Sequence, residues 1–225
     1  MCDSVLKSGE KYNVCMSCAE KIKYIKEPYC KKCGKPLEKE YEEYCGDCTG
    51  KATSFEYGRA VFSYNMYIRE SISRFKYHGR KEYAEFYADR MYECCSDWIK
   101  KILPDALIPV PIHKKRYNKR GYNQSELIAD KLGALCGIPV LSDYILRRKN
   151  TRPQKELTPV ERENNLKNAF VITKKAKELY KAVNCVIIID DIYTTGSTIE
   201  ACSHIIKENG VSTVYFLCVS IGMGF

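Results

Sequence analysis

Two neighbouring carboxylates, Asp190 and Asp191, stand shortly before a run of hydroxyl side chains interrupted by one glycine. That run consists of Thr194, Thr195, Gly196, Ser197 and Thr198. A hydroxyl-rich turn that enters a helix offers free backbone N–H groups and the positive end of the helix dipole, which suit a phosphate. The carboxylates would repel a phosphate, but they can accept hydrogen bonds from sugar hydroxyls or hold Mg²⁺ through its waters. A site that binds a phosphate next to sugar hydroxyls matches a ribose 5-phosphate ligand.

The residues on either side of this motif have the patterns of a strand and a helix. Residues 186–189 are apolar and β-branched without polar alternation, which predicts a buried parallel strand. After the turn, Ile199, Cys202 and Ile206 recur at helical spacing, and Gly210 is a stop signal. The alternative is an ordinary strand, turn and helix with a solvated acidic turn. Because all positions of 186–198 fit, the sequence favours a phosphate site.

The segment 186–198 resembles the binding motif of type I phosphoribosyltransferases. This resemblance implies that Asp190 and Asp191 are the catalytic carboxylates that contact the ribose hydroxyls. It also implies that residues 194–198 hold the 5-phosphate of phosphoribosyl pyrophosphate, with Mg²⁺ as the accompanying cofactor. The implied fold is an α/β domain with a parallel sheet and flanking helices.

A basic segment follows a second predicted strand at 106–111. Residues 113–120 include His113 and five full positive charges but no acid: Lys114, Lys115, Arg116, Lys119 and Arg120. Loops at the carboxyl ends of parallel strands gather at one edge of a doubly wound sheet, where ligands bind. We therefore expect a basic loop that faces the phosphate turn, with residues 113–116 binding pyrophosphate. A solvated basic face is the alternative.

Three CxxC pairs occupy the first part of the chain: Cys15 with Cys18, Cys30 with Cys33, and Cys45 with Cys48. Two such turns complete a tetrahedral S4 site, so the second and third pairs are predicted to hold a structural Zn²⁺. Redox chemistry at a CxxC turn is the alternative. Cys15 and Cys18 need further ligands, and Cys2 is the nearby thiol. The pattern therefore leaves open whether one or two zinc ions bind, and whether the natural start lies upstream.

Taken in order, these features are similar to the ComF family: the cysteine pairs, the Pro109–Pro111 strand end with its basic segment, the RGYNQ run at 120–124, and the motif at 186–198. The resemblance implies a zinc-ribbon module at residues 1–50 and a phosphoribosyltransferase-like domain at residues 51–225. It also implies a link to DNA uptake in natural competence. Residues 147–170 fit the family pattern too, and by resemblance they form a loop that closes over substrate and places Arg152 or Lys155 on the leaving pyrophosphate.

Two functions from different classes follow. The first is magnesium-dependent transfer of a phosphoribosyl group to an acceptor that the sequence does not identify. The second is a competence protein that handles single-stranded DNA without turnover, with Tyr117 and Tyr122 stacking on bases and the zinc ribbon docking a helicase. Packing is the alternative for both tyrosines. The intact pair of Asp190 and Asp191 favours the first function.

The remaining composition sets limits on the class of protein. The net charge is +9, and residues 101–150 hold ten basic and four acidic side chains, a balance of +6 that indicates a localised anionic partner. No apolar run approaches the ~18 residues of a membrane span, and the start lacks a signal pattern. We therefore expect a cytoplasmic protein, of an oligomeric state that the sequence leaves open. Lys76 and His78 are interpreted as compensation for a helix dipole, with contact to a ligand as the alternative.

Overall fold

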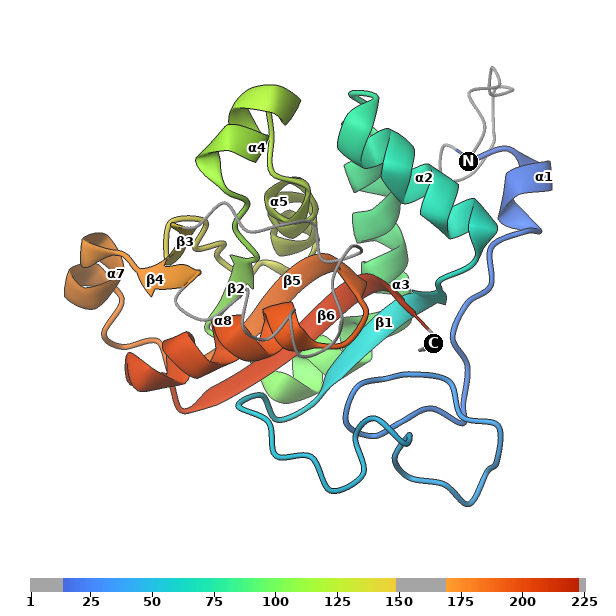
Figure 1. The fold of residues 1–225 in the computed structure, drawn as a ribbon, viewed down its shortest axis with the longest axis horizontal. Coiled ribbons are helices and arrows are strands. Elements are labelled where there is room, and N and C mark those ends of the chain that lie inside the picture. The colour runs from blue at the N-terminus through green and yellow to red at the C-terminus, as the bar shows by residue number, and fades with distance from the viewer. Residues whose placement is uncertain (1–13, 149–168, 223–225) are drawn as a thin grey trace.

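The computed structural model describes residues 14–148 and 169–222 (Figure 1). The helices and strands are, in chain order, α1 (Met16–Ala19), β1 (Gly58–Ser63), α2 (Met66–Tyr77), α3 (Tyr83–Ile102), β2 (Ala106–Pro109), α4 (Lys114–Arg120), α5 (Gln124–Cys136), β3 (Ile145–Arg147), β4 (Phe170–Ile172), α7 (Lys174–Leu179), β5 (Cys185–Tyr193), α8 (Ser197–Glu208) and β6 (Thr213–Ile221). Arg152 and Lys155, which the sequence places on a closing loop, lie outside the described residues.

A parallel sheet in the order β1–β6–β5–β2 forms the centre of the α/β part. Val186 to Ile189 in β5 are completely buried, as the uninterrupted apolar run predicts for a strand covered on both faces. Pro109 of β2 lies opposite Ile189 of β5, so the carboxyl ends of these strands meet at one edge of the sheet. The residues that follow them are thereby brought together.

Helices cover both faces of this sheet (Figure 1). Ile187 and Ile189 pack into a cluster with α2, α3 and α5, whereas Val186 and Ile188 pack into a second cluster with α8. This alternation follows from the period of two along a strand. The predicted architecture, a parallel sheet with flanking helices behind an N-terminal cysteine module, is confirmed.

The basic segment at 113–120 is not the loop that the sequence predicts, because residues Lys114–Arg120 form the helix α4. His113 caps this helix: its Nδ1 accepts a hydrogen bond from the Lys115 N–H at 3.1 Å. Gly121, at φ 82°, ends the helix in the left-handed conformation. The two caps explain how seven residues with five cations can remain helical.

The cysteine module packs directly on the α/β part. Cys30 and Cys33 belong to the same buried cluster as Phe55 and Phe216. The backbone N–H of Gly58, at the start of β1, donates to the carbonyl of Lys32 at 2.9 Å. A small metal module that shares a core with its neighbour does not need to supply a large core of its own.

Among the residues that the structure describes, no helix has both the length and the apolar character needed to cross a bilayer.

Candidate anion-binding site and metal centre

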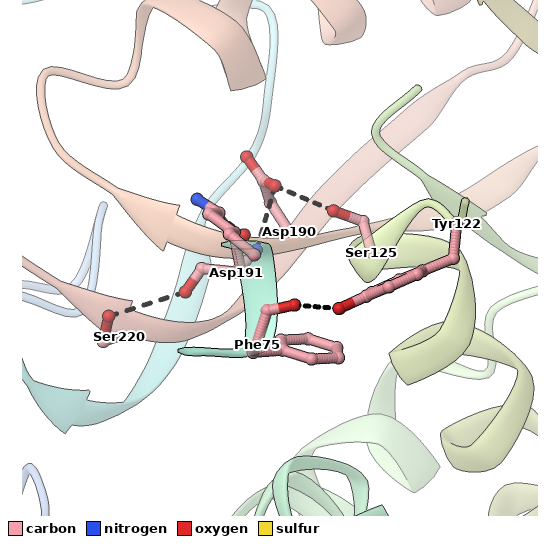
Figure 2. A network of polar contacts seen from close by, with 7 residues as sticks. Phe75, Tyr122, Ser125, Asp190, Asp191 and Ser220 are labelled. Atoms are coloured by element: carbon pink, nitrogen blue, oxygen red, sulfur yellow. Dashed lines mark hydrogen bonds and ion pairs between the residues drawn. The ribbon is translucent and has the colours of Figure 1, made fainter. Parts of the chain in front are cut away.

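The acidic pair lies near the carboxyl end of β5, at the edge where β2 also ends (Figure 2). Asp190 Oδ1 accepts two hydrogen bonds of 2.9 Å, one from Ser125 Oγ and one from the Asp191 N–H. Ser125 is the second residue of α5 and is buried, so the start of that helix fixes the Asp190 carboxylate. Both of these bonds use Oδ1, and no residue in the described part of the chain hydrogen-bonds Oδ2.

Asp191 forms an ion pair with Lys76, a residue that the sequence interpretation favoured as dipole compensation. Lys76 Nζ lies 2.8 Å from Oδ1 and 2.7 Å from Oδ2 of Asp191, so one ammonium contacts both carboxylate oxygens. Lys76 is the penultimate residue of α2, 115 positions before its partner. The packing of α2 beside the end of β5 makes this contact, which no local pattern could predict.

The environment raises the pKa of Asp190. Burial is the largest cause, because it disfavours the charged form, and the neighbouring charge of Asp191 raises the pKa further. Lys76, the Asp191 N–H and Ser125 act in the opposite direction, and the resulting pKa is about 7. Asp190 can therefore exchange a proton near neutral pH, while Lys76 neutralises its neighbour.

Two arginines from other elements are coupled to this pair. The Arg120 guanidinium, at the end of α4, interacts with the charge of Asp191, and burial lowers the pKa of Arg120. Arg147, in β3, interacts with Asp190; burial, followed by repulsion from Arg116, lowers the pKa of Arg147 to about 10. Together with Lys76, cations from three separate elements act on the carboxylates. The sequence singled out none of these three as a contact of the acidic pair.

The residues predicted to bind pyrophosphate have different environments. Lys114 and Lys115 are exposed on the first turn of α4, and His113 is its N-cap. Arg116 is half-buried and close enough to Arg147 to lower that residue's pKa, so it is the member coupled to the acidic edge. Pyrophosphate binding by these four residues stays a prediction.

Tyr122 is not available for base stacking. Its side chain is 4% exposed, and its hydroxyl donates to the carbonyl of Phe75 (Figure 2). The hydrogen bond and the tilted contact between the two rings join the start of α5 to the last turn of α2. The packing interpretation is therefore correct for this tyrosine, which contacts the residue before Lys76. Tyr117 is 48% exposed.

The turn after β5, which the sequence predicts to hold a phosphate, places a glycine in the left-handed conformation at the start of α8. Gly196 has φ 79° and occupies the N-cap position of α8, where it has no side chain to hydrogen-bond the first N–H groups of the helix. A Cβ at this position would lie 2.3 Å from Tyr193 Oη. Thr195 Oγ1 and Ser197 Oγ are 2.8 Å apart. Glycine is thus needed both for the backbone angle and for the close approach of Tyr193.

The predicted metal ligands Cys30, Cys33, Cys45 and Cys48 converge, with all four sulfurs within 4.8 Å of one another. Cys33 Sγ and Cys45 Sγ are 3.7 Å apart. A tetrahedral zinc site with Zn–S bonds of about 2.3 Å separates its sulfurs by about 3.8 Å, so the cluster fits Zn²⁺. Cys15 and Cys18 do not join this group, and Cys2 lies outside the described residues.

A family model agrees with the organisation of the cysteine module. A family model described as "Double zinc ribbon domain" matches residues 1–49, which together with the cysteine geometry supports a structural Zn²⁺. Among solved structures, a purine phosphoribosyltransferase from Pyrococcus horikoshii is 17% identical, with a TM-score of 0.35 and coverage of 60% of this chain and 73% of that one.

Three curated relatives match along most of the chain. Competence protein F of Haemophilus influenzae is 32% identical over 213 residues, which are 91% of this chain and 88% of that protein. Competence protein ComFC of Bacillus subtilis is 31% identical over 215 residues, 92% of this chain and 82% of that protein. DNA utilization protein YhgH of Salmonella typhimurium is 28% identical over 211 residues, 92% and 90% of the two chains. On this similarity, extended over nearly the full length of two competence proteins, the chain belongs to the ComF family.

Proposed function

We propose that this chain binds phosphoribosyl pyrophosphate with Mg²⁺ at the carboxyl edge of its sheet and transfers the phosphoribosyl group to an acceptor. The observation that carries the proposal is the order of groups along β5 and α8. Two carboxylates are followed, after the last two residues of β5, by a turn in which left-handed Gly196 begins the helix. A polyol-binding group therefore stands beside an anion-binding group in one rigid segment.

In this proposal each end of the segment binds a different part of the ligand. Asp190 Oδ2 accepts a hydrogen bond from a ribose hydroxyl, while Oδ1 is held by Ser125 and the backbone. The N–H groups and hydroxyls of residues 194–198 receive the 5-phosphate. Lys76 keeps the Asp191 carboxylate oriented and limits the repulsion between the two carboxylates and the incoming anion.

The carboxylates also fit a magnesium site, because oxygen donors are those that Mg²⁺ prefers and Asp190 Oδ2 is available. When bound, Mg²⁺ would supply charge neutralisation for the pyrophosphate and the ribose hydroxyls. His113, Lys114, Lys115 and Arg116 are the proposed contacts to pyrophosphate, and the charge of Arg116 acts on Arg147 at the acidic edge. Arg152 and Lys155 remain proposed contacts of a closing loop.

The proposed transfer breaks the bond between the anomeric carbon and the pyrophosphate oxygen, and pyrophosphate leaves with the electron pair. A lone pair of the acceptor forms the new bond to that carbon. The cations of α4 stabilise the charge that develops on the leaving group, and the fixed carboxylates orient the ribose so that the acceptor can reach it.

Calorimetry with phosphoribosyl pyrophosphate and Mg²⁺ tests this proposal. We expect binding that is lost on chelation and weakened by Asp190→Asn combined with Asp191→Asn, because both ribose acceptors are then altered. Asp130→Asn is the matched control, since Asp130 is an exposed carboxylate on α5. Absence of binding by the parent protein, or equal binding by the paired variant, would refute the assignment. Release of pyrophosphate on addition of acceptor candidates then tests transfer.

A second function, binding of single-stranded DNA, is favoured by a specific surface. Tyr77 is 67% exposed, Tyr117 is 48% exposed, and the Arg120 guanidinium lies 5.3 Å from the Tyr77 ring centroid. Exposed rings beside cations suit stacked bases and a phosphate backbone. The names of the relatives, which refer to competence and DNA utilization, point in the same direction. In this function a helicase that docks on the zinc ribbon is a proposed partner.

Affinity for single-stranded oligonucleotides at increasing salt tests the second function. We expect affinity to fall steeply with salt, and the slope to decrease by about one for each phosphate contact removed by Lys114→Gln or Lys115→Gln. Tyr77→Ala should weaken binding, whereas Tyr41→Ala, which removes an exposed tyrosine of the cysteine module, should not. A salt response that is flat, or unchanged by the lysine variants, would count against DNA binding at α4.

A further inference from the structure

A hollow lies between the cysteine module and the phosphate turn, two parts that are far apart in the sequence. From the module side, its lining includes Cys33 and Cys48 of the metal group. From the other side it is lined by residues of the turn: Tyr193, Thr194, Thr195 and Gly196. The zinc ligands and the backbone proposed to hold the 5-phosphate therefore face the same small space.

Tyr193 is the residue that connects the two sides. Its ring stacks on Phe216, with 4.8 Å between centroids and 9° between planes, and the side chain is 7% exposed. Its hydroxyl and ring edge lie against Gly196, where a Cβ would approach Oη to 2.3 Å and Cζ to 2.7 Å. Phe216 in turn makes an edge contact with Phe55 at 5.0 Å, in the same buried cluster as Cys30 and Cys33. The turn thus rests on a ring that is packed against the metal group.

Two polar links tie the chain that leaves the module to α8. Glu200, in the first turn of α8, accepts hydrogen bonds from Ser54 N at 2.9 Å and from Ser54 Oγ at 2.6 Å. Farther along the helix, Lys207 Nζ lies 2.8 Å from Glu56 Oε1. The two contacts fix both ends of α8 relative to residues 54–56. A displacement of the module would therefore be transmitted to the helix that the turn opens.

We propose that the zinc centre positions the phosphate turn, with Tyr193 as the positioning residue between the metal-binding cysteines and Gly196. This inference rests on the proposed function, because it concerns the same 5-phosphate site. Zinc fixes the four cysteines relative to one another, and their packing fixes Tyr193. Tyr193 in turn limits the positions open to Gly196 and the amides after it. Loss of the metal loosens the turn and weakens ligand binding.

The hollow itself does not take the phosphate. Asp47 and Glu200 line it, and four thiolates around one Zn²⁺ carry a net negative charge. Lys51 is the lysine on its lining, and it does not outweigh those charges. The module therefore acts as a support behind the turn, and the ligand binds on the side of the turn that faces the acidic pair.

Titration calorimetry with ribose 5-phosphate and amide hydrogen exchange of residues 194–198 test this inference together. We expect Tyr193→Leu to weaken ribose 5-phosphate binding by about tenfold or more, as substitutions that support a site commonly do. Tyr193→Phe, which keeps the stacked ring, should restore affinity to within about twofold of the parent. Tyr215→Leu is the matched control, because Tyr215 is the same residue type on the neighbouring strand, packed against the cluster on the opposite face.

Removal of zinc from the full chain gives the second arm. We expect faster exchange at 194–198 and weaker binding in the stripped protein, with both restored by added Zn²⁺, while exchange in α5 stays slow. If the zinc-free protein unfolds as a whole, the affinities of Tyr193→Leu and Tyr193→Phe for ribose 5-phosphate decide whether the inference holds. Unchanged exchange at 194–198 in a stripped, folded protein would overturn the inference, as would equal affinity of Tyr193→Leu and the parent. Failure of the parent to bind ribose 5-phosphate would instead overturn the proposed function, and the exchange arm would still decide the coupling.

Discussion

Replacing Lys76 by methionine removes the ammonium that holds Asp191 and keeps the length of the side chain. The Asp191 side chain is 8% exposed and that of Lys76 is 21% exposed, so the pair is shielded from water. Removing one partner of a buried ion pair costs about 3–5 kcal/mol, because a charge is left without its counter-ion. Since Lys76 is reached by some solvent, we expect Lys76→Met to lower the free energy of unfolding by about 3 kcal/mol, the lower end of that range.

Urea unfolding at neutral pH, followed by the fluorescence of Trp98, measures this loss. Trp98 is partly buried against the core and contacts Tyr57 and Tyr215, so its emission reports the packed state. The cycle of Lys76→Met, Asp191→Asn and the double variant isolates the pair, with an expected coupling energy of about 2 kcal/mol. Lys101→Met is the matched control, because Lys101 is also the penultimate residue of its helix and is exposed.

The pH dependence gives a further check. Lys76 lowers the pKa of Asp190, so its removal raises that pKa above about 7 and leaves repulsion between the carboxylates unrelieved at neutral pH. At mildly acidic pH Asp190 is protonated, and the loss caused by Lys76→Met should shrink. A coupling energy below about 0.5 kcal/mol, typical of a surface pair, would refute the reasoning. Equal losses of unfolding free energy for Lys76→Met and Lys101→Met would also refute it, because the helix dipole alone would then explain both losses.

Other predictions concern titration, backbone and metal. The folded state raises the pKa of Asp190 from 3.8 to about 7, so the stabilisation contributed by its protonated form is complete below pH 3.8 and is lost as the pH rises through about 7. Asp190→Asn should therefore weaken the pH dependence of the urea midpoint across this window. Parallel pH profiles of the variant and the parent would contradict this prediction. Gly196→Ala should lower the melting temperature more than Gly137→Ala. Both glycines have a positive φ, but of the two only an added Cβ at Gly196 would collide with a neighbour, Tyr193. Equal shifts in melting temperature would show that the collision with Tyr193 costs nothing. Cys45→Ser should release zinc, measured by native mass spectrometry, and lower the melting temperature well beyond Cys136→Ser; retained zinc would exclude Cys45 as a ligand.

The features that sequence reasoning predicted well are those whose residues are neighbours in the chain. The strand at 186–189, the glycine turn and α8 follow from apolar period, backbone freedom and capping within one short segment. The spacing of Cys30, Cys33, Cys45 and Cys48 predicts a tetrahedral group because each CxxC turn already fixes two sulfurs. The helix α4 was predicted as a loop, because the run of five cations was given more weight than the capping residues His113 and Gly121 at its two ends.

The residues that sequence reasoning missed are brought to the site by packing between distant elements. Ser125 and Arg147 reach Asp190 from α5 and β3, and neither occupies a position with a local signal. Tyr122 shows the same effect in reverse: its basic surroundings in the sequence suggested an exposed ring, and the contact with Phe75 buries it. Periodicity identifies a buried face of an element, but it does not identify the element that covers that face.

By itself, the sequence determined the chemistry available to this protein: a carboxylate pair, a phosphate-type turn, a basic segment and a set of zinc ligands. Only the tertiary structure decided how these groups act on one another. It placed Lys76 on Asp191 and set the metal group behind Tyr193 and the turn. The physical reason is that residue types and short spacings fix local geometry, whereas the pairing of charges and the support of a turn depend on which surfaces the folded chain brings into contact.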